Sequence, residues 1–205
     1  MSKYENFTTS EKKLNPLVEG ENLILETKPK KSAFMLNKIL TMMPIALLWL
    51  AFDSFFIIMM FQTETPSGIL FFIVPFFALH LMPVWIWLGN VLTANRKWKN
   101  TTYYVTDKRI IIENGFVAGN YQTIYYKDIK NVRINIGIID KLLGVGDIYF
   151  DTEVPGVNAF LDVENAFDIY PRIQKVVMDI QTDIEYPNAY RPEDNPGYNT
   201  KYNEK

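Results

Sequence analysis

Two long hydrophobic runs, separated by a short polar connection, dominate the pattern of this chain. The runs cover residues 39–61 and 69–92, and the connection covers 62–68. Each run exceeds the ~20 residues with which a helix crosses a ~30 Å hydrocarbon layer. Neither run has the polar face that a helix at the surface of a soluble domain would carry. The pattern therefore predicts a transmembrane hairpin, with helices over 39–61 and 69–92 and an external turn over 62–68.

Positive charge flanks this hairpin but is missing from its turn. The basic residues that precede the first run and follow the second are Lys28, Lys30, Lys31, Lys38, Arg96, Lys97 and Lys99. Basic segments next to membrane helices stay on the cytoplasmic side. We therefore expect a multi-pass protein of the cytoplasmic (inner) membrane, with both termini in the cytoplasm and the 62–68 turn outside.

Two ionisable residues interrupt the hydrophobic runs, Asp53 in the first and His80 in the second. In a tight antiparallel hairpin they lie within about one helical turn in depth, since a helix rises ~1.5 Å per residue. A carboxylate at the bilayer centre costs about 3 kcal/mol, so a partner is valuable. We expect the two side chains to face each other or the same oligomer interface. The alternative is that each one snorkels or bonds a backbone carbonyl separately.

Short β-branched or alternating runs replace the long apolar runs beyond the hairpin, and they predict strands. Phe116-Val117 begins a further, interrupted strand, and Gly144-Val145-Gly146-Asp147 is expected to turn the chain after a short helical segment over 137–143. The segment 21–27, before the hairpin, is also a strand, which has to pair with the domain beyond the hairpin. The strands expected beyond the hairpin cover 101–106, 109–113, 121–126, 128–136, 148–152 and 158–163.

A helical pattern follows the last strand. It begins at Asn165 or Asp168, ends near Thr182, and predicts a helix packed against the core of the sheets. Its apolar stripe consists of Phe167, Tyr170, Ile173, Val176, Val177 and Ile180. The ends of the chain, 1–20 and 183–205, are polar and are expected to be a disordered arm and tail. Between them we expect a strand and membrane-side linker over 21–38, the hairpin, and a cytoplasmic domain over 99–182.

Composition excludes several classes of function. The chain of 205 residues has no cysteine, one histidine, 21 Lys and Arg, and 23 Asp and Glu. Without cysteine there are no disulfides or thiolate sites. Since the histidine lies in an apolar run, the soluble part has no His-activated nucleophile and no usual zinc ligand set. The balanced charge lacks the basic face of a nucleic-acid binder. We expect no catalytic residue, no cofactor, no metal and no nucleic-acid partner.

Two local motifs have a simpler interpretation than a binding site. Gly144-Val145-Gly146 lacks the remaining residues of a phosphate-binding loop and precedes a strand rather than a helix. We interpret it as a turn. Asp147, Asp151 and Glu153 follow one another along and just after a strand. We interpret them as a solvated face, with a divalent-ion site as the alternative.

Four segments of the chain together form a recognisable pattern. They are Tyr103-Tyr104-Val105-Thr106-Asp107-Lys108-Arg109-Ile110 with Gly115, Ile129-Lys130-Asn131-Val132, Leu143-Gly144-Val145-Gly146-Asp147-Ile148, and Gly20-Glu21 before the hairpin. This pattern resembles the bacterial pleckstrin-homology-like membrane proteins of the DUF304, or bPH2, family. The resemblance implies an α+β fold: a two-helix transmembrane hairpin and a PH-like, strongly bent antiparallel β-barrel capped by a C-terminal helix. It implies no activity, because one fold supports many functions.

The expected function follows from these features. We expect a non-catalytic, membrane-anchored interaction or scaffold module that contacts the lipid bilayer and a protein partner or a second copy of itself. The alternative is a module that senses a lipid headgroup or envelope stress. A third reading makes the chain a subunit of a transport assembly that uses Asp53 and His80.

Overall fold

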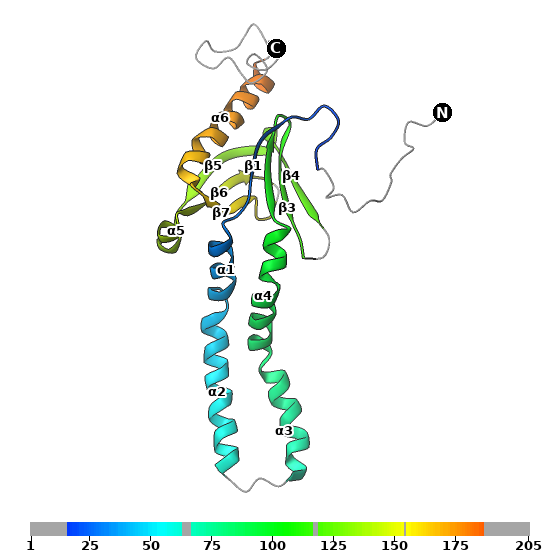
Figure 1. The fold of residues 1–205 in the computed structure, drawn as a ribbon. Helices are drawn as coiled ribbons and strands as arrows, with labels where there is room; N and C mark the ends of the chain where they lie inside the picture. Colours follow the sequence, from blue (N-terminus) through cyan, green and yellow to red (C-terminus); the bar gives the residue numbers. More distant parts are fainter. Residues whose placement is uncertain (1–15, 63–66, 117–118, 154, 187–205) are drawn as a thin grey trace, which may run out of the picture.

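The protein consists of two long helical arms joined to a body of two sheets and a C-terminal helix (Figure 1). It is seen in a computed structural model that describes residues 16–62, 67–116, 119–153 and 155–186. The first arm contains α1 (Lys31–Leu40) and α2 (Met43–Gln62). The second arm contains α3 (Ser67–His80) and α4 (Met82–Lys99). Both arms leave the body at the same end and run side by side.

A proline lies close to the point where each arm changes from one helix to the next. A proline lacks the backbone N–H that an interior helical residue donates, but it is tolerated in the first turn of a helix. Pro44 and Pro83 lie in the first turns of α2 and α4, just after the interruptions of the two arms. At Leu81 the second arm bends by 52°. Each arm therefore consists of two helices with a proline just after the interruption, whereas Pro75 lies inside α3 without ending it.

The helices extend beyond the apolar runs at the end nearest the body. The first arm is helical from Lys31 and the second through Lys99, whereas the apolar runs begin at residue 39 and end at residue 92. Hydropathy marks the apolar part of a helix and does not mark its polar continuation. Within the described residues, Lys31–Gln62 is long and apolar enough to cross a membrane, and the second arm qualifies if its bent halves count as one span.

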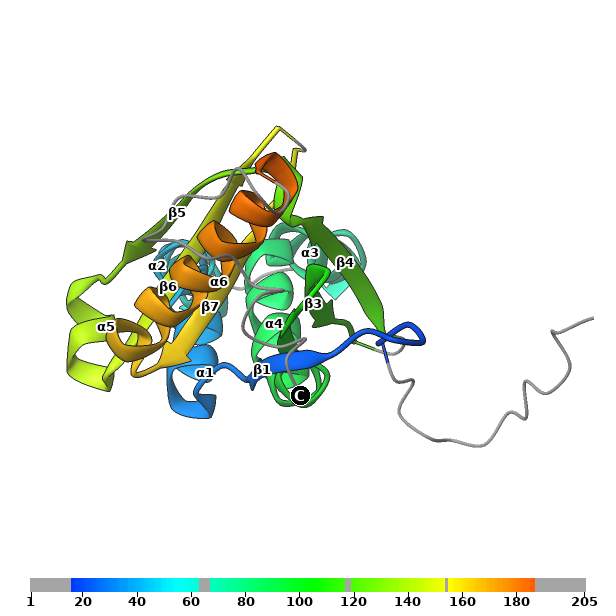
Figure 2. The same cartoon turned by 90° about the horizontal axis from the view of Figure 1, so that it is seen from above.

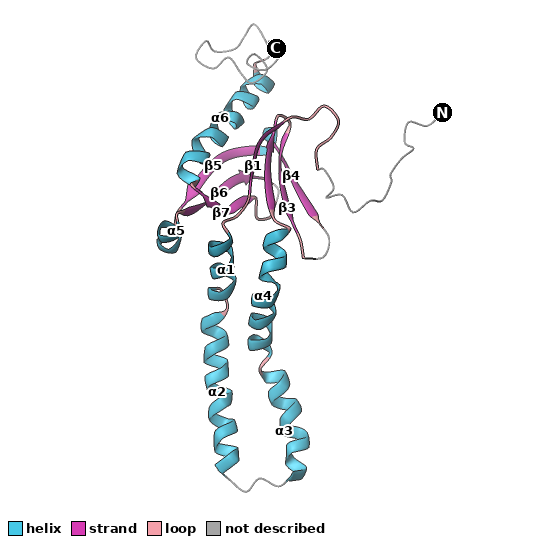
Figure 3. Ribbon diagram, in the orientation of Figure 1, coloured by secondary structure: helices cyan, strands magenta, loops and turns pink. Residues whose placement is uncertain are grey.

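The body contains two antiparallel sheets (Figure 3). The four-stranded sheet has the order β1-β2-β3-β4 and the three-stranded sheet the order β5-β6-β7. The remaining elements of the body are a 3-10 turn, η1 (Tyr126–Asp128), which joins the sheets, and the helices α5 (Ile138–Leu143) and α6 (Ala166–Glu185). The strands are β1 (Leu23–Thr27), β2 (Thr102–Thr106), β3 (Arg109–Asn114), β4 (Asn120–Tyr125), β5 (Ile129–Asn135), β6 (Val145–Thr152) and β7 (Ala159–Glu164). Apart from shifts at their ends, these are the predicted strands.

Strand β1 joins the chain before the arms to the chain after them. It pairs with β2, with Leu25 opposite Val105 and Thr27 opposite Tyr103. The predicted pairing of this segment with the domain beyond the arms is confirmed. Because β1 leads into α1 and α4 leads into β2, this pairing holds the two arms together where they enter the body.

Two local predictions were wrong. The segment Gly144-Val145-Gly146-Asp147 is not a turn, because β6 already begins at Val145. Only Gly144 takes a left-handed conformation, with φ 65°, and it ends α5. Gly146 lies within the strand, and glycine is needed there because a Cβ would meet Ile136 Cγ1 at 2.9 Å and Ala166 Cβ at 3.0 Å. Phe116 lies in a loop rather than opening a strand, and Val117 lies outside the described residues.

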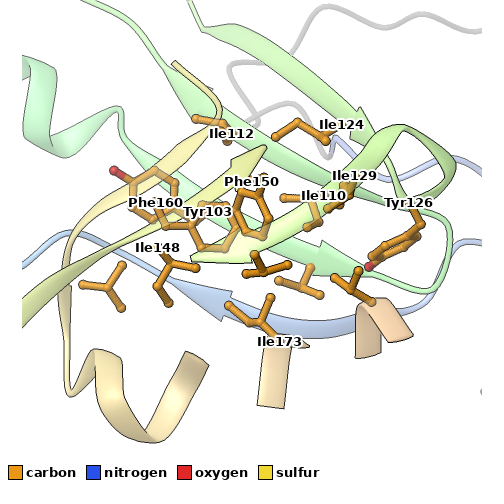
Figure 4. Close-up of a cluster of buried hydrophobic side chains, with 14 of the residues drawn as sticks. Tyr103, Ile110, Ile112, Ile124, Tyr126, Ile129, Ile148, Phe150, Phe160 and Ile173 are labelled. Carbon is orange, nitrogen blue, oxygen red and sulfur yellow. The ribbon is translucent and has the colours of Figure 1, made fainter. Parts of the chain in front are cut away.

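The hydrophobic core fills the space between the sheets and α6 (Figure 4). Tyr103 of β2 stacks on Phe160 of β7 with ring centroids 4.6 Å apart, which connects the two sheets. From above, α6 lies over the three-stranded sheet (Figure 2). Ile173, Val177 and Ile180 of its predicted stripe are buried, but Phe167 is 71% exposed. The prediction for Phe167 was wrong because a strict three-residue spacing drifts around a helix of 3.6 residues per turn.

Candidate functional site

The basic residues that flank the arms lie where the arms meet the sheets. Lys30 is tied to the body, since its Nζ lies 3.0 Å from Glu164 Oε1 and donates to the Leu143 carbonyl oxygen at 3.0 Å. Its backbone N–H also donates to the Asp162 carbonyl at 2.8 Å. Lys28 is exposed in the connection between β1 and α1. Part of the flanking charge therefore fastens the first arm to the edge of β7.

Two other basic residues that flank the arms lie over aromatic rings, one ring on the second arm and one in the β3–β4 loop. Lys31 Nζ lies 5.2 Å from the centre of the Trp98 ring, and the Arg96 guanidinium lies 5.7 Å from the centre of the Phe116 ring. Contacts of this kind attract a cation to the face of a ring. Trp98 Nε1 also donates to the Pro29 carbonyl oxygen at 2.8 Å, across the arms. Lys99 is exposed at the end of α4.

A pocket of about 460 Å³ opens between the arms and the two sheets. Phe34 and Lys38 of α1 line it from one arm, and Lys97 of α4 lines it from the other. Phe116 of the β3–β4 loop and Leu161 of β7 contribute apolar surface. None of the described residues that line this pocket is acidic. The pocket therefore combines an apolar wall with two ammonium groups.

An acidic group lies beside this pocket, at the contact of α1 with β7. Asp162 is 3% exposed and accepts a hydrogen bond from Asn37 Nδ2 at 2.6 Å. Burial raises its pKa to about 6, and the nearby charges of Asp147 and Asp140 add to this, while Asn37 and Lys38 act in the opposite direction. Asp162 also has a left-handed backbone, with φ 56°. At neutral pH the contact between arm and sheet therefore holds a buried carboxylate that is easily protonated.

Asp53 and His80 come together between the arms. His80 Nδ1 lies 2.7 Å from Asp53 Oδ1, and the side chain of Asp53 is 1% exposed whereas that of His80 is 30% exposed. The His80 ring stacks on Phe76 at 5.3 Å between centroids and lies 5.6 Å from the Trp49 ring. The pair is thus enclosed by aromatic rings in the middle of the apolar arms.

This pair leaves hydrogen-bonding capacity unused. Asp53 Oδ2 and Trp49 Nε1 are buried and have no hydrogen-bond partner among the described residues. A buried polar atom without a partner destabilises the fold by about 1–3 kcal/mol. The geometry suits a pairing of the two arms.

The acidic residues on and just after β6 face different partners. Asp151 forms a bidentate pair with Arg133 at 2.7 and 2.8 Å, and Glu153 pairs with Lys130 at 2.8 Å. Asp147 instead accepts a hydrogen bond from the Asp162 backbone N–H at 2.9 Å. Their carboxylates point to three different partners, and the described residues contain no group of three His, Asp or Glu that could hold a metal ion.

Sequence reasoning missed the pocket and Asp162. The pocket is built from segments far apart in the chain, and no local pattern marks it. Asp162 did carry a signal, since it interrupts the apolar residues 159–163 of the strand Ala159–Glu164. A lone carboxylate in such a strand points to a partner on a neighbouring element, which here is Asn37 of α1.

Comparison with protein families places most of the chain in a known group. A family model described as a bacterial PH domain matches residues 43–177. The match begins at the start of α2 and ends within α6, so it includes most of both arms and all strands except β1. Searches among curated proteins and among solved structures found no match.

Proposed function

The chain belongs to the bacterial PH domain family, and on this premise we propose that it is a membrane-anchored, non-catalytic interaction module. Membership confirms the resemblance noted in the sequence. In this proposal the two arms form a transmembrane hairpin in the cytoplasmic membrane. The two sheets form a bent, barrel-like PH scaffold on the cytoplasmic side, capped by α6.

The observation that carries the proposal is the apolar surface that the arms expose. In the most apolar part of the first arm only 11% of the residues are buried within the protein. Leu48 is 68% exposed, Phe55 60% and Phe71 79%. Soluble monomers rarely expose contiguous apolar patches larger than a few hundred Å². A lipid environment removes this surface from water, and α2, with 20 residues, reaches across ~30 Å of hydrocarbon.

The distribution of charge supports the orientation. The seven basic flanking residues are carried by the body end of the arms, and the 62–68 connection at the far end has none. By the positive-inside rule this distribution supports a body on the cytoplasmic side.

Cysteine labelling tests the topology, because the natural chain has no cysteine. Gly68→Cys should react with a membrane-impermeant maleimide in intact cells, whereas Glu185→Cys should react only after permeabilisation. Labelling of both positions in intact cells, or recovery of the chain in the soluble fraction, would contradict the anchoring.

The edges of the sheets support the interaction part of the proposal. Two of the four edges are covered: Pro29 forms a β-bridge with Val163 of β7, and α6 covers β5, where Tyr170 Oη donates to the Val132 carbonyl oxygen at 3.1 Å. β1 and β4 end the four-stranded sheet, each with one neighbouring strand. An edge strand is a natural template for a strand of another chain. We infer that a protein partner or a second copy adds there.

Photo-crosslinking tests this edge. A benzophenone amino acid at Tyr125 of β4, which is 50% exposed, should crosslink to protein in native membranes. The same probe at Met178 of α6, which is 53% exposed, is the matched control and should not. The mass of the product distinguishes a second copy from another protein. Equal crosslinking at both positions, or none at Tyr125, would rule out addition at this edge.

One specific observation favours the lipid-headgroup alternative. This is the pocket that places Lys38 and Lys97 beside an apolar wall at the membrane end of the body.

A further inference from the structure

We propose that the pocket between the arms and the sheets binds the headgroup of an anionic phospholipid from the leaflet that surrounds the arms. The inference rests on the proposed membrane anchoring. It adds a ligand class and the residues that bind it.

The depth of the pocket matches the headgroup layer. If α2 (Met43–Gln62) crosses the ~30 Å of hydrocarbon, Met43 lies at the boundary between the hydrocarbon and the headgroup layer. Lys38 then lies about 8 Å beyond that boundary and Phe34 about 14 Å beyond it, at ~1.5 Å per residue. Headgroup layers extend roughly 5–8 Å on each side of the hydrocarbon. The cationic side of the pocket therefore lies level with lipid phosphates, and its apolar wall lies just above them.

The charges of the pocket favour an anion. Lys38 Nζ lies 5.3 Å from the centre of the Phe34 ring, and Lys97 Nζ lies 3.4 Å from Asn90 Oδ1. Within the described part of the chain, neither ammonium group forms an ion pair with a carboxylate at up to 4.0 Å. Lys38 also interacts with the negative charge of Asp162, which is itself buried. Two half-buried ammonium groups are thus available to a phosphate, which lysine binds as a point charge.

The apolar lining distinguishes a lipid from free phosphate. Phe34, Phe116 and Leu161 offer hydrocarbon surface that a small inorganic anion would not use. A volume of about 460 Å³ falls within the ~300–1,000 Å³ of small-molecule sites. We assign the phosphate to Lys38 and Lys97 and the carbon atoms of the headgroup substituent beyond the phosphate to the apolar wall, while the backbone glycerol and the acyl chains remain in the bilayer. A zwitterionic lipid would bring a cationic group toward the same lysines, so the site should prefer a headgroup with net negative charge.

Native mass spectrometry of the full chain tests this site. The protein is reconstituted in nanodiscs with equal amounts of phosphatidylglycerol and phosphatidylcholine of identical acyl chains, and the lipids retained after release are counted. The wild-type chain should retain phosphatidylglycerol several-fold over phosphatidylcholine. The double variant Lys38→Gln/Lys97→Gln should lose this preference, and Lys38→Arg/Lys97→Arg should keep it.

The matched control is Lys28→Gln/Lys99→Gln, which removes the same charge from two exposed flanking lysines outside the pocket. It should retain phosphatidylglycerol like the wild type. Equal retention of the two lipids by the wild type, or an equal loss in both glutamine variants, would overturn the site. Displacement of the lipid by excess inorganic phosphate would overturn the lipid assignment in favour of a soluble anion.

Insertion into the nanodisc is scored separately, by co-elution with the scaffold protein. A chain that inserts without lipid preference contradicts the pocket proposal and leaves the anchoring intact. A chain that does not insert contradicts the anchoring, and the pocket proposal falls with it. If the glutamine variant does not fold, the preference of the wild-type chain decides the question.

Discussion

Glu21 and Arg109 form a bidentate ion pair that joins the chain before the arms to the chain after them. Arg109 Nε donates to Glu21 Oε1 at 2.9 Å, and a terminal guanidinium nitrogen donates to Oε2 at 3.0 Å. The Glu21 side chain is 0% exposed and that of Arg109 is 18% exposed. Thr106 Oγ1 completes the site by donating to Glu21 Oε1 at 2.7 Å. This contact holds the start of β1 against the β2–β3 turn.

Replacing Glu21 by glutamine should destabilise the body. The change leaves the buried Arg109 guanidinium without its counter-charge, which typically reduces stability by about 3–5 kcal/mol. Thermal unfolding of the purified full chain measures the effect. The control is Asp151→Asn, which breaks a bidentate pair with Arg133 whose side chains are 57% and 36% exposed. That variant should lose less than about 1 kcal/mol, and similar losses in both would contradict the assigned role of burial.

The Glu21–Arg109 pair should make the protein less stable in acid. Burial alone would raise the pKa of Glu21, but the hydrogen bonds from Arg109, the Val18 amide and Thr106 outweigh it and lower the pKa from 4.5 to about 2. A carboxylate whose pKa is lower in the folded state than in the unfolded state stabilises the fold at pH values above the unfolded pKa. This stabilisation is lost as the pH falls from about 4.5 to about 2. The difference in Tm between wild type and Glu21→Gln should therefore narrow over that range. A constant difference would contradict this linkage.

Replacing Asp162 by asparagine should stabilise the protein at neutral pH. The raised pKa of about 6 means that the folded state binds a proton more tightly than the unfolded state. The contribution of the Asp162 carboxyl to the stability of the folded state therefore increases as the pH falls from about 6 toward 4, and it is lost as the pH rises through 6. Asparagine is neutral, accepts the same hydrogen bond from Asn37 and tolerates a positive φ.

The expected gain for Asp162→Asn at pH 7 is on the order of 3 kcal/mol, since the pKa rises from 3.8 to about 6 and one pKa unit corresponds to about 1.4 kcal/mol. Its stability should also vary less with pH between about 4 and 6 than that of the wild type. Asp162→Ala removes the acceptor for Asn37 and should destabilise the protein instead. An asparagine variant as unstable as the alanine variant would show that the charge itself is required.

The Asp53–His80 contact should appear as a coupling between the arms. We expect a double-mutant cycle of Asp53→Ala and His80→Ala, measured by unfolding in detergent, to give a coupling of about 1–2 kcal/mol. This exceeds the ~0.6 kcal/mol average of hydrogen bonds between membrane helices, because a carboxylate takes part. Thr93, which bonds the Gly89 carbonyl in α4, provides the control. A cycle of Thr93→Ala with Asp53→Ala should show no coupling, and unchanged stability of Asp53→Asn would argue against a structural pair.

Gly146 should tolerate no larger residue. In Gly146→Ala the added methyl meets Ile136 and Ala166 at 2.9 and 3.0 Å, and overpacking of this kind costs typically about 1–3 kcal/mol. Gly89→Ala is the control, since nothing lies within 4 Å of a Cβ at this position in α4. Alanine should stabilise that helix by up to about 1 kcal/mol. Equal effects in thermal unfolding would contradict the close packing of β6.

The elements that sequence predicted well are those with a strong local period. The apolar arms, the alternation of β5 and the helix α6 each repeat a pattern over several residues, and their order along the chain was correct. The errors have separate causes. Gly146 was interpreted as a turn residue, but it lies within β6, where glycine is needed because Ile136 and Ala166 leave no room for a Cβ.

The contacts between side chains that are far apart in the chain depend on the tertiary structure, unlike the elements themselves. The sequence by itself determined the two apolar arms, the strands, and the absence of cysteine chemistry, since each depends on composition or on near neighbours. The depths of Asp53 and His80 also followed from helix geometry. Only the tertiary structure decided that Glu21 meets Arg109, that Asp162 is buried against Asn37, and that Lys38 and Lys97 line one pocket. These contacts join segments separated by the arms or by several strands, and their geometry depends on sheet register and helix bends that no local pattern encodes.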